Sequence, residues 1–561
     1  MIRKRLACGG AIAALALSMN VVAAQSNAVG TEKIKHVLLL SIDGMHAVDY
    51  YNCARGIAGA NGGDPYCPNL AALGKSGINY VAASASKPSD SAPGLMALVT
   101  GGTPKTTGIY YDVAFDRSLD GPQIATGTGL AAAPCTPYTA PIGTTTDNDQ
   151  GIDIDDTQLN GGADATAAAI DPRKLSRNPA AGCAVVYPWN FLRTNTIFGV
   201  IHEAGGYTAW IDKHPSYAMA AGPGGRGLDD YYAPEVDSNV VALPGVQTSL
   251  GASCATVRDT SAPSWNESFD DIQCYDALRV NALLHEIAGE RHDGSPAATP
   301  TIMGMNFQAV YTGMSVNETG VATGGYQNAA GLPSPELLRE IQSVDTSIGA
   351  LVNALKDKGI YDDTLIIVTA KHGSSPIDPT RYLANGTNTP ATLLGTRIPF
   401  SESPLNPTGI GATEDDVSVL WLNKGESVPA AVAILEQNAT AIGLGQIYYG
   451  PSLSLNYNVG GWGPGQDPRT PDIIVTPNVG VTYSSSTTMI ADHGGFAHDD
   501  TNVMLLVANP GFNPQTVFAD TATTQVAPTI LKALGLNPAS LKAVKAEGTP
   551  VLPEVEAQLT H

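Results

Sequence analysis

Two stretches of the chain are runs of apolar, partly β-branched residues that end in polar side chains. The run at 37–42 leads to Asp43, and the run at 365–369 leads to Lys371 and His372. Such runs predict buried strands of a parallel sheet. Because ligands of open α/β sheets bind at the C-terminal edge of the strands, these polar residues are candidates for a functional site. The alternative for Asp43 is that it only completes a turn.

Elsewhere along the chain, apolar residues recur at helical spacing. A helix that leads into a strand is the βαβ pattern of an α/β protein with a parallel sheet. The pattern predicts helices at 67–78, 92–100, 195–204, 334–358 and 523–538, and further strands at 207–211, 300–310, 470–483 and within 487–511.

The predicted helix at 92–100 has Pro93 near its start and glycines at its end, so that Ser91 falls at its N-terminus. Free backbone N–H groups and the positive end of the helix dipole stabilise anions at this position, including an ionised hydroxyl. Ser91 is therefore a candidate nucleophile. The alternative is that it is an ordinary N-cap.

Two polar, loop-rich segments interrupt the pattern, at 111–190 and 215–295, and we interpret them as insertions over the strand edge. An acidic run at 153–156 is either a calcium ligand set or a solvated turn. Between the insertions, the predicted strand at 207–211 is followed by Lys213 and His214. These two side chains belong either to a functional site or to a surface turn.

The first 24 residues combine a basic start, an apolar centre and small residues up to Ala24, as in a secretory signal peptide. No stretch is apolar for long enough to span a bilayer. An even number of cysteines remains beyond residue 24, which favours disulfides in an exported chain, and proximity suggests one of several possible connectivities. The suggested pairs are Cys53–Cys67, Cys135–Cys183 and Cys254–Cys274. We therefore expect a secreted or periplasmic protein that is not attached to a membrane.

The net charge of −22 at pH 7 argues against binding to nucleic-acid polymers or anionic membranes. A local cationic pocket remains compatible with this balance.

Four pieces of sequence carry a resemblance to a known family: HVLLLSIDGM, SAPGLMALVTGG followed by PKTTGI, DTLIIVTAKHG, and ADHGG with the later TTQVAPTILKALGL. In this order they resemble the alkaline phosphatase superfamily, in particular its type I phosphodiesterase/nucleotide pyrophosphatase branch. The resemblance implies a three-layer α/β/α fold with a mostly parallel central sheet and loop-rich insertions. It implies a catalytic domain over 33–545 and a C-terminal tail over 546–561.

The resemblance also implies roles for individual residues. Asp43 corresponds to the first metal-binding aspartate, and Ser91 corresponds to the nucleophile, which is also a metal ligand. His372 and His493 correspond to metal-binding histidines, and the neighbouring Asp492 is a further candidate ligand. The implied cofactor is a divalent metal, one or two ions, with zinc favoured and calcium or magnesium as alternatives.

The chain departs from the family pattern at informative places. Lys371 stands where the family has a carboxylate, and Asn306 and Val310 stand where an Asp-x-x-x-His pair is expected. The segment GGYTAWIDKHP is similar to a sulfatase segment, which makes Lys213 and His214 candidates for binding the substrate anion.

From these residues we expect a metal-dependent hydrolase of small phosphate esters, of the phosphodiesterase, nucleotide pyrophosphatase or phosphatase type. Ser91 attacks phosphorus and forms a phosphoseryl intermediate. Lys371 or Lys213 supplies positive charge where a metal is missing, which favours substrates of lower charge. One alternative is a sulfatase-like or phosphonate-ester hydrolase with one metal. Another is an exported, non-catalytic binding protein with a degraded metal site.

Overall fold

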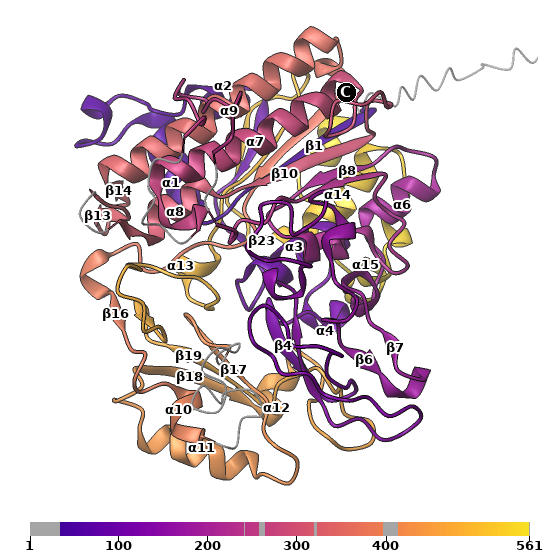
Figure 1. The fold of residues 1–561 in the computed structure, drawn as a ribbon. Coiled ribbons are helices and arrows are strands. Elements are labelled where there is room, and N and C mark those ends of the chain that lie inside the picture. Colours follow the sequence, from indigo (N-terminus) through magenta and orange to yellow (C-terminus); the bar gives the residue numbers. More distant parts are fainter. Residues whose placement is uncertain (1–33, 240–241, 257–263, 319–321, 396–412, 560–561) are drawn as a thin grey trace, which may run out of the picture. The chain divides into compact units, whose positions relative to one another are not determined.

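An eight-stranded sheet forms the centre of the fold (Figure 1). The computed structural model describes residues 34–239, 242–256, 264–318, 322–395 and 413–559, so the predicted signal peptide lies outside the described residues. The strand order is β22-β2-β21-β15-β1-β10-β8-β9. The bounds are β1 His36–Ile42, β2 Gly77–Tyr80, β8 Ala209–Ile211, β9 Asp230–Tyr232, β10 Ile302–Phe307, β15 Thr364–Thr369, β21 Leu505–Ala508 and β22 Gln515–Val517.

Strands β15, β1, β10 and β8 are parallel neighbours, and their C-terminal ends are level with one another. Ser41 of β1 pairs with Thr369 of β15 and Asn306 of β10, and Met305 pairs with Ile211 of β8. Strand β21 is antiparallel to both β15 and β2, and it connects β2 and β22 to the rest of the sheet. The polar residues that follow β1, β8 and β15 therefore meet at one edge.

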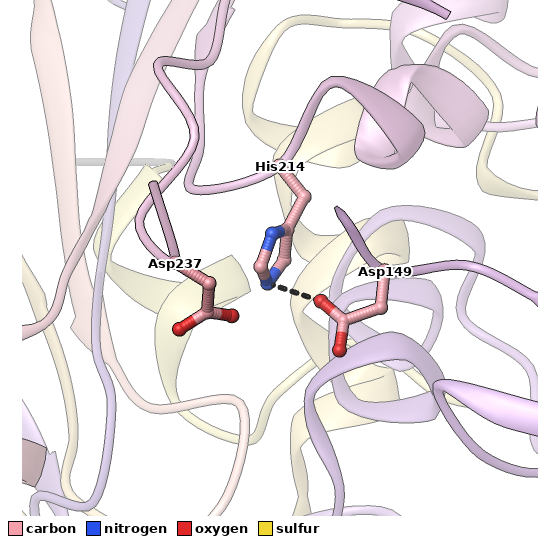
Figure 2. A group of neighbouring side chains, drawn as sticks. All are labelled: Asp149, His214 and Asp237. Atoms are coloured by element: carbon pink, nitrogen blue, oxygen red, sulfur yellow. Dashed lines mark ion pairs between the residues drawn. The ribbon is translucent and has the colours of Figure 1, made fainter. Parts of the chain in front are cut away.

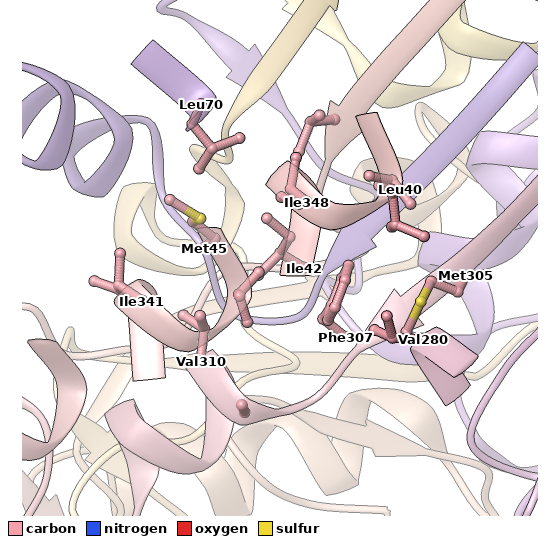
Figure 3. Close-up of a cluster of buried hydrophobic side chains, with 14 of the residues drawn as sticks. Leu40, Ile42, Met45, Leu70, Val280, Met305, Phe307, Val310, Ile341 and Ile348 are labelled. Carbon is pink, nitrogen blue, oxygen red and sulfur yellow. The ribbon is translucent and has the colours of Figure 1, made fainter. Parts of the chain in front are cut away.

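Alternate residues of β1 point to opposite faces of the sheet, and each face has its own core. Leu40 and Ile42 pack with Phe307, Ile341 and residues of the helices on one face (Figure 3). The helices of this face are α2 Pro68–Gly74, α7 Phe269–Ala288, α8 Ala309–Ser315 and α9 Pro335–Lys358. The other face is covered by α3 Ser91–Thr100, α6 Ile197–Glu203 and α14 Val526–Ala533.

The long helix α9 illustrates how local sequence sets an element. The Ser334 side chain accepts a hydrogen bond from the Leu337 N–H, Pro335 occupies the first turn, and Gly359 ends the helix at φ 77°. Its buried residues include Leu337, Ile341, Val344, Ile348, Leu351 and Leu355, spaced three or four apart. The predicted helix at 334–358 is therefore present.

A second, three-stranded sheet has the order β17-β19-β18 and is antiparallel. Its strands are β17 Ser418–Leu420, β18 Leu444–Tyr449 and β19 Ile473–Pro477, with helices α10 Pro390–Leu394, α11 Val428–Gln437 and α12 Gly450–Ser454 nearby. Trp421, Leu435 and Ile473 lie in its core, which Phe115 of the first insertion joins.

The three predicted disulfides are confirmed, with Cα–Cα distances of 5.2 Å for Cys53–Cys67, 5.9 Å for Cys135–Cys183 and 5.7 Å for Cys254–Cys274. The first insertion contains the hairpins of β4 Val113–Asp116 with β5 Thr144–Asp147 and β6 Arg177–Asn178 with β7 Ala184–Val185. Within the described ranges, no helix combines the length and apolar character needed to cross a membrane.

Two segments contribute more to the core than the sequence pattern indicated. The stretch 215–295 supplies β9 and α7, which belong to the central layers. The expected tail also packs against the sheet, because Leu552 and Val555 are buried in the core beside α14. Both segments were missed because their apolar residues lie within stretches that are polar overall.

Two buried carboxyl groups, Asp416 and Asp500, lie where the second sheet meets the central one. Asp416 Oδ1 accepts a 2.6 Å hydrogen bond from Thr482, and its backbone N–H donates to the His493 carbonyl. Asp500 is in α13 His498–Thr501, and its Oδ1 accepts from the Gly495 N–H at 3.0 Å. Burial raises the pKa of Asp500 to about 7, to which Asp499 adds while Asp416 and His46 lower it. Burial and the nearby Asp500 and Asp492 also raise the pKa of Asp416.

These carboxyl groups predict that the protein loses stability as pH rises. An aspartate with a raised pKa binds its proton more tightly when folded, so its stabilisation is complete below about pH 4 and is lost as pH rises toward the folded value near 7. We expect Asp500→Asn, which keeps the Oδ1 acceptor, to raise stability at pH 8 by about 1 to 3 kcal/mol and to flatten the pH dependence between pH 5 and 8.

Thermal unfolding of wild type, Asp500→Asn and the exposed control Asp357→Asn at a series of pH values measures this effect. The control removes the same charge and should leave the slope unchanged. An Asp500→Asn profile as steep as that of wild type would contradict the assignment.

Candidate active site

Ser91 is the first residue of α3 and is fully buried. The N-cap is the preceding residue, Asp90, and no side-chain capping bond is formed. The Ser91 hydroxyl instead accepts a 2.9 Å hydrogen bond from Lys213 Nζ and lies 3.1 Å from His372 Nε2. The hydroxyl is therefore directed toward two chemically active groups at the N-terminus of a helix.

The close approach of α3 to the loop after β15 depends on Gly94. A Cβ at this position would lie 2.3 Å from the Lys371 carbonyl oxygen, which is closer than any side chain tolerates. The absence of a side chain lets the first turn of α3 rest against the backbone of Lys371. Ser91 consequently reaches His372, the next residue in the loop.

Asp43 follows β1 and is surrounded by positive and amide groups. Its Oδ2 accepts hydrogen bonds from Gln308 at 2.6 Å and Asn306 at 3.1 Å. The same oxygen lies 3.5 Å from Lys371 Nζ and 3.7 Å from Lys213 Nζ. Burial alone would raise the pKa of Asp43, but Lys371, His372 and Lys213 hold it well below its usual range. Asp43 is therefore ionised.

Lys371 is fully buried and bridges two strand ends. Its ammonium group lies 3.3 Å from Asp212 Oδ1 as well as 3.5 Å from Asp43, and 4.9 Å from the centre of the Tyr217 ring. Trp210 donates a 2.8 Å hydrogen bond to the other oxygen of Asp212. Lys371 thus joins the carboxylates that follow β1 and β8.

Lys213 is the second ammonium group of the centre. Burial would lower its pKa, but Asp43, Asp112 and Asp149 reverse this effect and raise it, so Lys213 carries a positive charge. Its side chain is 10% exposed, while Asp43 is 1% exposed. The centre therefore reaches solvent beside Lys213.

The two histidines of the centre have different environments. His372 Nδ1 lies 2.8 Å from the carbonyl oxygen of Gly373, which only accepts hydrogen bonds, so Nδ1 carries a proton and Nε2 faces Ser91. The His493 ring packs 4.0 Å from that of His372, and His493 Nδ1 is 3.5 Å from Asp90. Burial, together with His372 and Lys213, lowers the pKa of His493 well below its usual range.

Two residues predicted for the centre make their contacts elsewhere. Asp492 Oδ1 accepts hydrogen bonds from the Tyr311 hydroxyl at 3.2 Å and from the His493 N–H at 2.9 Å. His214 is held between two carboxylates, with Nε2 2.7 Å from Asp149 and Nδ1 2.7 Å from Glu235. The centre around Ser91 therefore consists of Asp43, Ser91, Lys213, Lys371 and His372, with His493 beside it.

Charge balance tests whether a divalent metal suits this centre. The positive charges of Lys213 and Lys371 are already matched by Asp43 and Asp212, and all four side chains are buried. An ion bound to Asp43 Oδ2 would lie beside the ammonium groups of Lys371 and Lys213, which are 3.5 and 3.7 Å from that oxygen, in a medium that solvates charge poorly. This arrangement of residues does not suit a divalent ion, and we derive no chemical step from one.

Gln308 was not singled out from the sequence. It follows β10 and donates to Asp43 together with Asn306, which stands where the family pattern has a metal ligand. Its position near the end of a predicted strand, two residues after Asn306, is the feature of the sequence that could have indicated it.

The comparisons with known proteins agree with this topology. The model of the family "Type I phosphodiesterase / nucleotide pyrophosphatase" matches residues 37–137 and 321–496, which include Asp43, Ser91, Lys371, His372 and His493. No curated protein matches the chain.

Two solved structures of murine ectonucleotide pyrophosphatase/phosphodiesterase 5 are similar in fold. One is that of an inactive variant in complex with AMP. Each is 15% identical, has a TM-score of 0.51, and is matched over 90% of this chain and 96% of the murine chain. Family segments and fold together confirm the resemblance seen in the sequence: residues 37–137 and 321–496 match the type I phosphodiesterase/nucleotide pyrophosphatase family, and the chain has the fold of the murine protein.

Proposed function

We propose that this protein hydrolyses phosphate diesters, using Ser91 as the nucleophile. The observation that supports this most is the position of the Ser91 hydroxyl, 2.9 Å from Lys213 Nζ and 3.1 Å from His372 Nε2 at the N-terminus of α3. A base and a cation then act on one oxygen at the positive end of a helix dipole.

In the first step, His372 Nε2 accepts the proton of Ser91 as Oγ attacks phosphorus in line. The new Oγ–P bond forms while the bond from phosphorus to the leaving alcohol breaks on the opposite side, and the alcohol oxygen takes up a proton from solvent water. In the second step, the hydroxide so formed attacks phosphorus from the vacated side, the Oγ–P bond breaks, Oγ takes its proton back from His372, and the phosphate monoester leaves. His372 acts first as base and then as acid, as its single free ring nitrogen allows.

In this proposal, the ammonium groups of the protein supply the positive charge that stabilises the transferred phosphoryl group. Lys213 is close enough to Ser91 to contact a non-bridging oxygen of a bound phosphate, and the N-terminus of α3 contributes the positive end of its dipole. Lys371 keeps Asp43 and Asp212 neutralised behind them. The metal dependence expected from the resemblance is replaced here by lysine charge.

The charges of the centre favour a substrate with a single negative charge. Two ammonium groups are balanced by two carboxylates, and Asp90 and Asp112 lie close by. A diester or a nucleotide linkage with one charge per phosphate fits this balance better than a dianionic monoester. The AMP complex of the murine relative supports a nucleotide-type substrate. A sulfate monoester carries the same charge and is the second candidate.

We also propose that the protein is exported. Three disulfides are expected in an oxidising compartment, and the pattern of residues 1–24 is that of a signal peptide.

Replacing the nucleophile tests the reaction. We expect Ser91→Ala to lower hydrolysis of bis-p-nitrophenyl phosphate by about 10³-fold or more, because no other hydroxyl takes its place. Thermal stability should change little, since Ser91 makes no capping bond. The matched control is Ser347→Ala, a buried serine of α9 whose hydroxyl bonds to Ser343.

Steady-state assays with the phosphate diester, a phosphate monoester and a sulfate ester, each run on wild type and both variants, measure this prediction. Activity in Ser91→Ala equal to wild type excludes Ser91 as nucleophile. A wild type that binds nucleotide but turns over none of the three esters indicates a binding protein instead.

The two lysines should respond differently to substitution. We expect Lys213→Met to lower kcat/KM for the diester about 10²-fold with a small loss of stability, because this lysine contacts the nucleophile and Lys371 stays beside Asp43. Lys371→Met should destabilise the fold by about 3 to 5 kcal/mol, because it removes the ion pair of the buried Asp212 and one of the two ammonium groups beside Asp43.

Diester kinetics and urea unfolding of both variants, with the exposed Lys105→Met as control, separate the two roles. Full activity in Lys213→Met, or unchanged stability in Lys371→Met, would show that the corresponding charge is not used in this way.

A further inference from the structure

A group of metal-ligand side chains lies where the two insertions meet the end of β8 (Figure 2). Asp149 comes from the first insertion, His214 follows Lys213, and Asp237 comes from the second insertion. Each offers one ligand atom, and these atoms lie within 4.8 Å of one another, which holds for no other such group within the described ranges. None of the three belongs to the set around Ser91.

Glu235 fixes the orientation of this group. Its Oε1 is 2.7 Å from His214 Nδ1 and accepts a 3.0 Å hydrogen bond from the Asp237 N–H. A ring whose Nδ1–H donates to a carboxylate can offer the Nε2 lone pair to a metal in place of the Nε2–H that faces Asp149 at 2.7 Å, and metal-binding histidines usually have such a partner. In Figure 2, His214 Nε2 points between the carboxylates of Asp149 and Asp237.

The surroundings of the group are rich in carboxyl groups. Both oxygens of Asp153 and Oε2 of Glu235 are buried and accept no hydrogen bond from an N–H group among the described residues. Asp149, Asp237 and Glu235 place three carboxyl groups around the imidazole of His214. A divalent cation would balance their charge.

We propose that Asp149, His214 and Asp237 bind one divalent cation, for which the combination of one imidazole and two carboxylates suits Zn²⁺. The ion ties both insertions to the end of β8. Because His214 directly follows Lys213, it also fixes the backbone from which Lys213 reaches Ser91. This site is separate from the chemistry at Ser91, and its occupancy is measured without reference to turnover.

The test uses the full-length protein, stripped with a chelator and then titrated with ZnCl₂ alone. We expect one ion per chain by calorimetry and elemental analysis, and a rise in Tm of about 3 °C or more at saturating zinc. Asp149→Asn and Asp237→Asn should each weaken zinc binding at least about tenfold. The matched control is Asp164→Asn, an exposed aspartate of the first insertion, which should bind zinc as wild type does.

Circular dichroism checks that each variant is folded, and the wild-type titration decides the question even if a variant is not. No zinc uptake by the stripped wild type would overturn the proposal and assign a protonated His214 between Asp149 and Glu235. An ion that Asp43→Asn loses and Asp149→Asn retains would also overturn it, because the ion would then lie at the other centre.

Discussion

Lys371 is a fully buried ammonium group, and the arrangement of the centre follows from the need to balance its charge. An unpaired buried charge costs far more than a folded protein can tolerate, so carboxylates must approach it from the surrounding strands. Asp43 after β1 and Asp212 after β8 supply them. The ion pairs therefore hold three strand ends together, and they leave the neighbouring His372 and Lys213 directed at Ser91.

The short distance between α3 and the loop after β15 is the second requirement. Gly94 permits it, and Asp90 rather than Ser91 occupies the N-cap, which leaves the serine hydroxyl free for other partners. The position of the serine hydroxyl thus depends on Asp90, Ser91 and Gly94 together. Each is visible in the sequence, but their joint effect depends on the tertiary packing of the helix.

The elements of the fold could be predicted because their patterns are local. Apolar runs marked β1 and β15, helical spacing marked α9, and sequence proximity paired the cysteines correctly. The contacts of the centre could be predicted only in part. Asp43, Lys371 and His372 follow strands that the pattern revealed, but the contact of Lys213 with Ser91 depends on the order of β8 and β15 in the sheet.

The group around His214 was beyond sequence reasoning for a physical reason. Asp149 and Asp237 lie in polar segments without periodicity, and Glu235 is one carboxylate among many in an acidic chain. Only the folding of two insertions toward one strand end brings them together. The expected metal ligands, in contrast, came from the resemblance, and Lys371 was already visible there as a cation in the place of a carboxylate.

The place of β21 in the central sheet has a consequence for how the chain matures. Strands β2 and β22 pair with the remaining strands only through β21, whose residues are translated long after those of β2. In a nascent chain, β2 therefore cannot join the sheet until β21 has left the ribosome. Synthesis of the early strands and assembly of the sheet are separated in time.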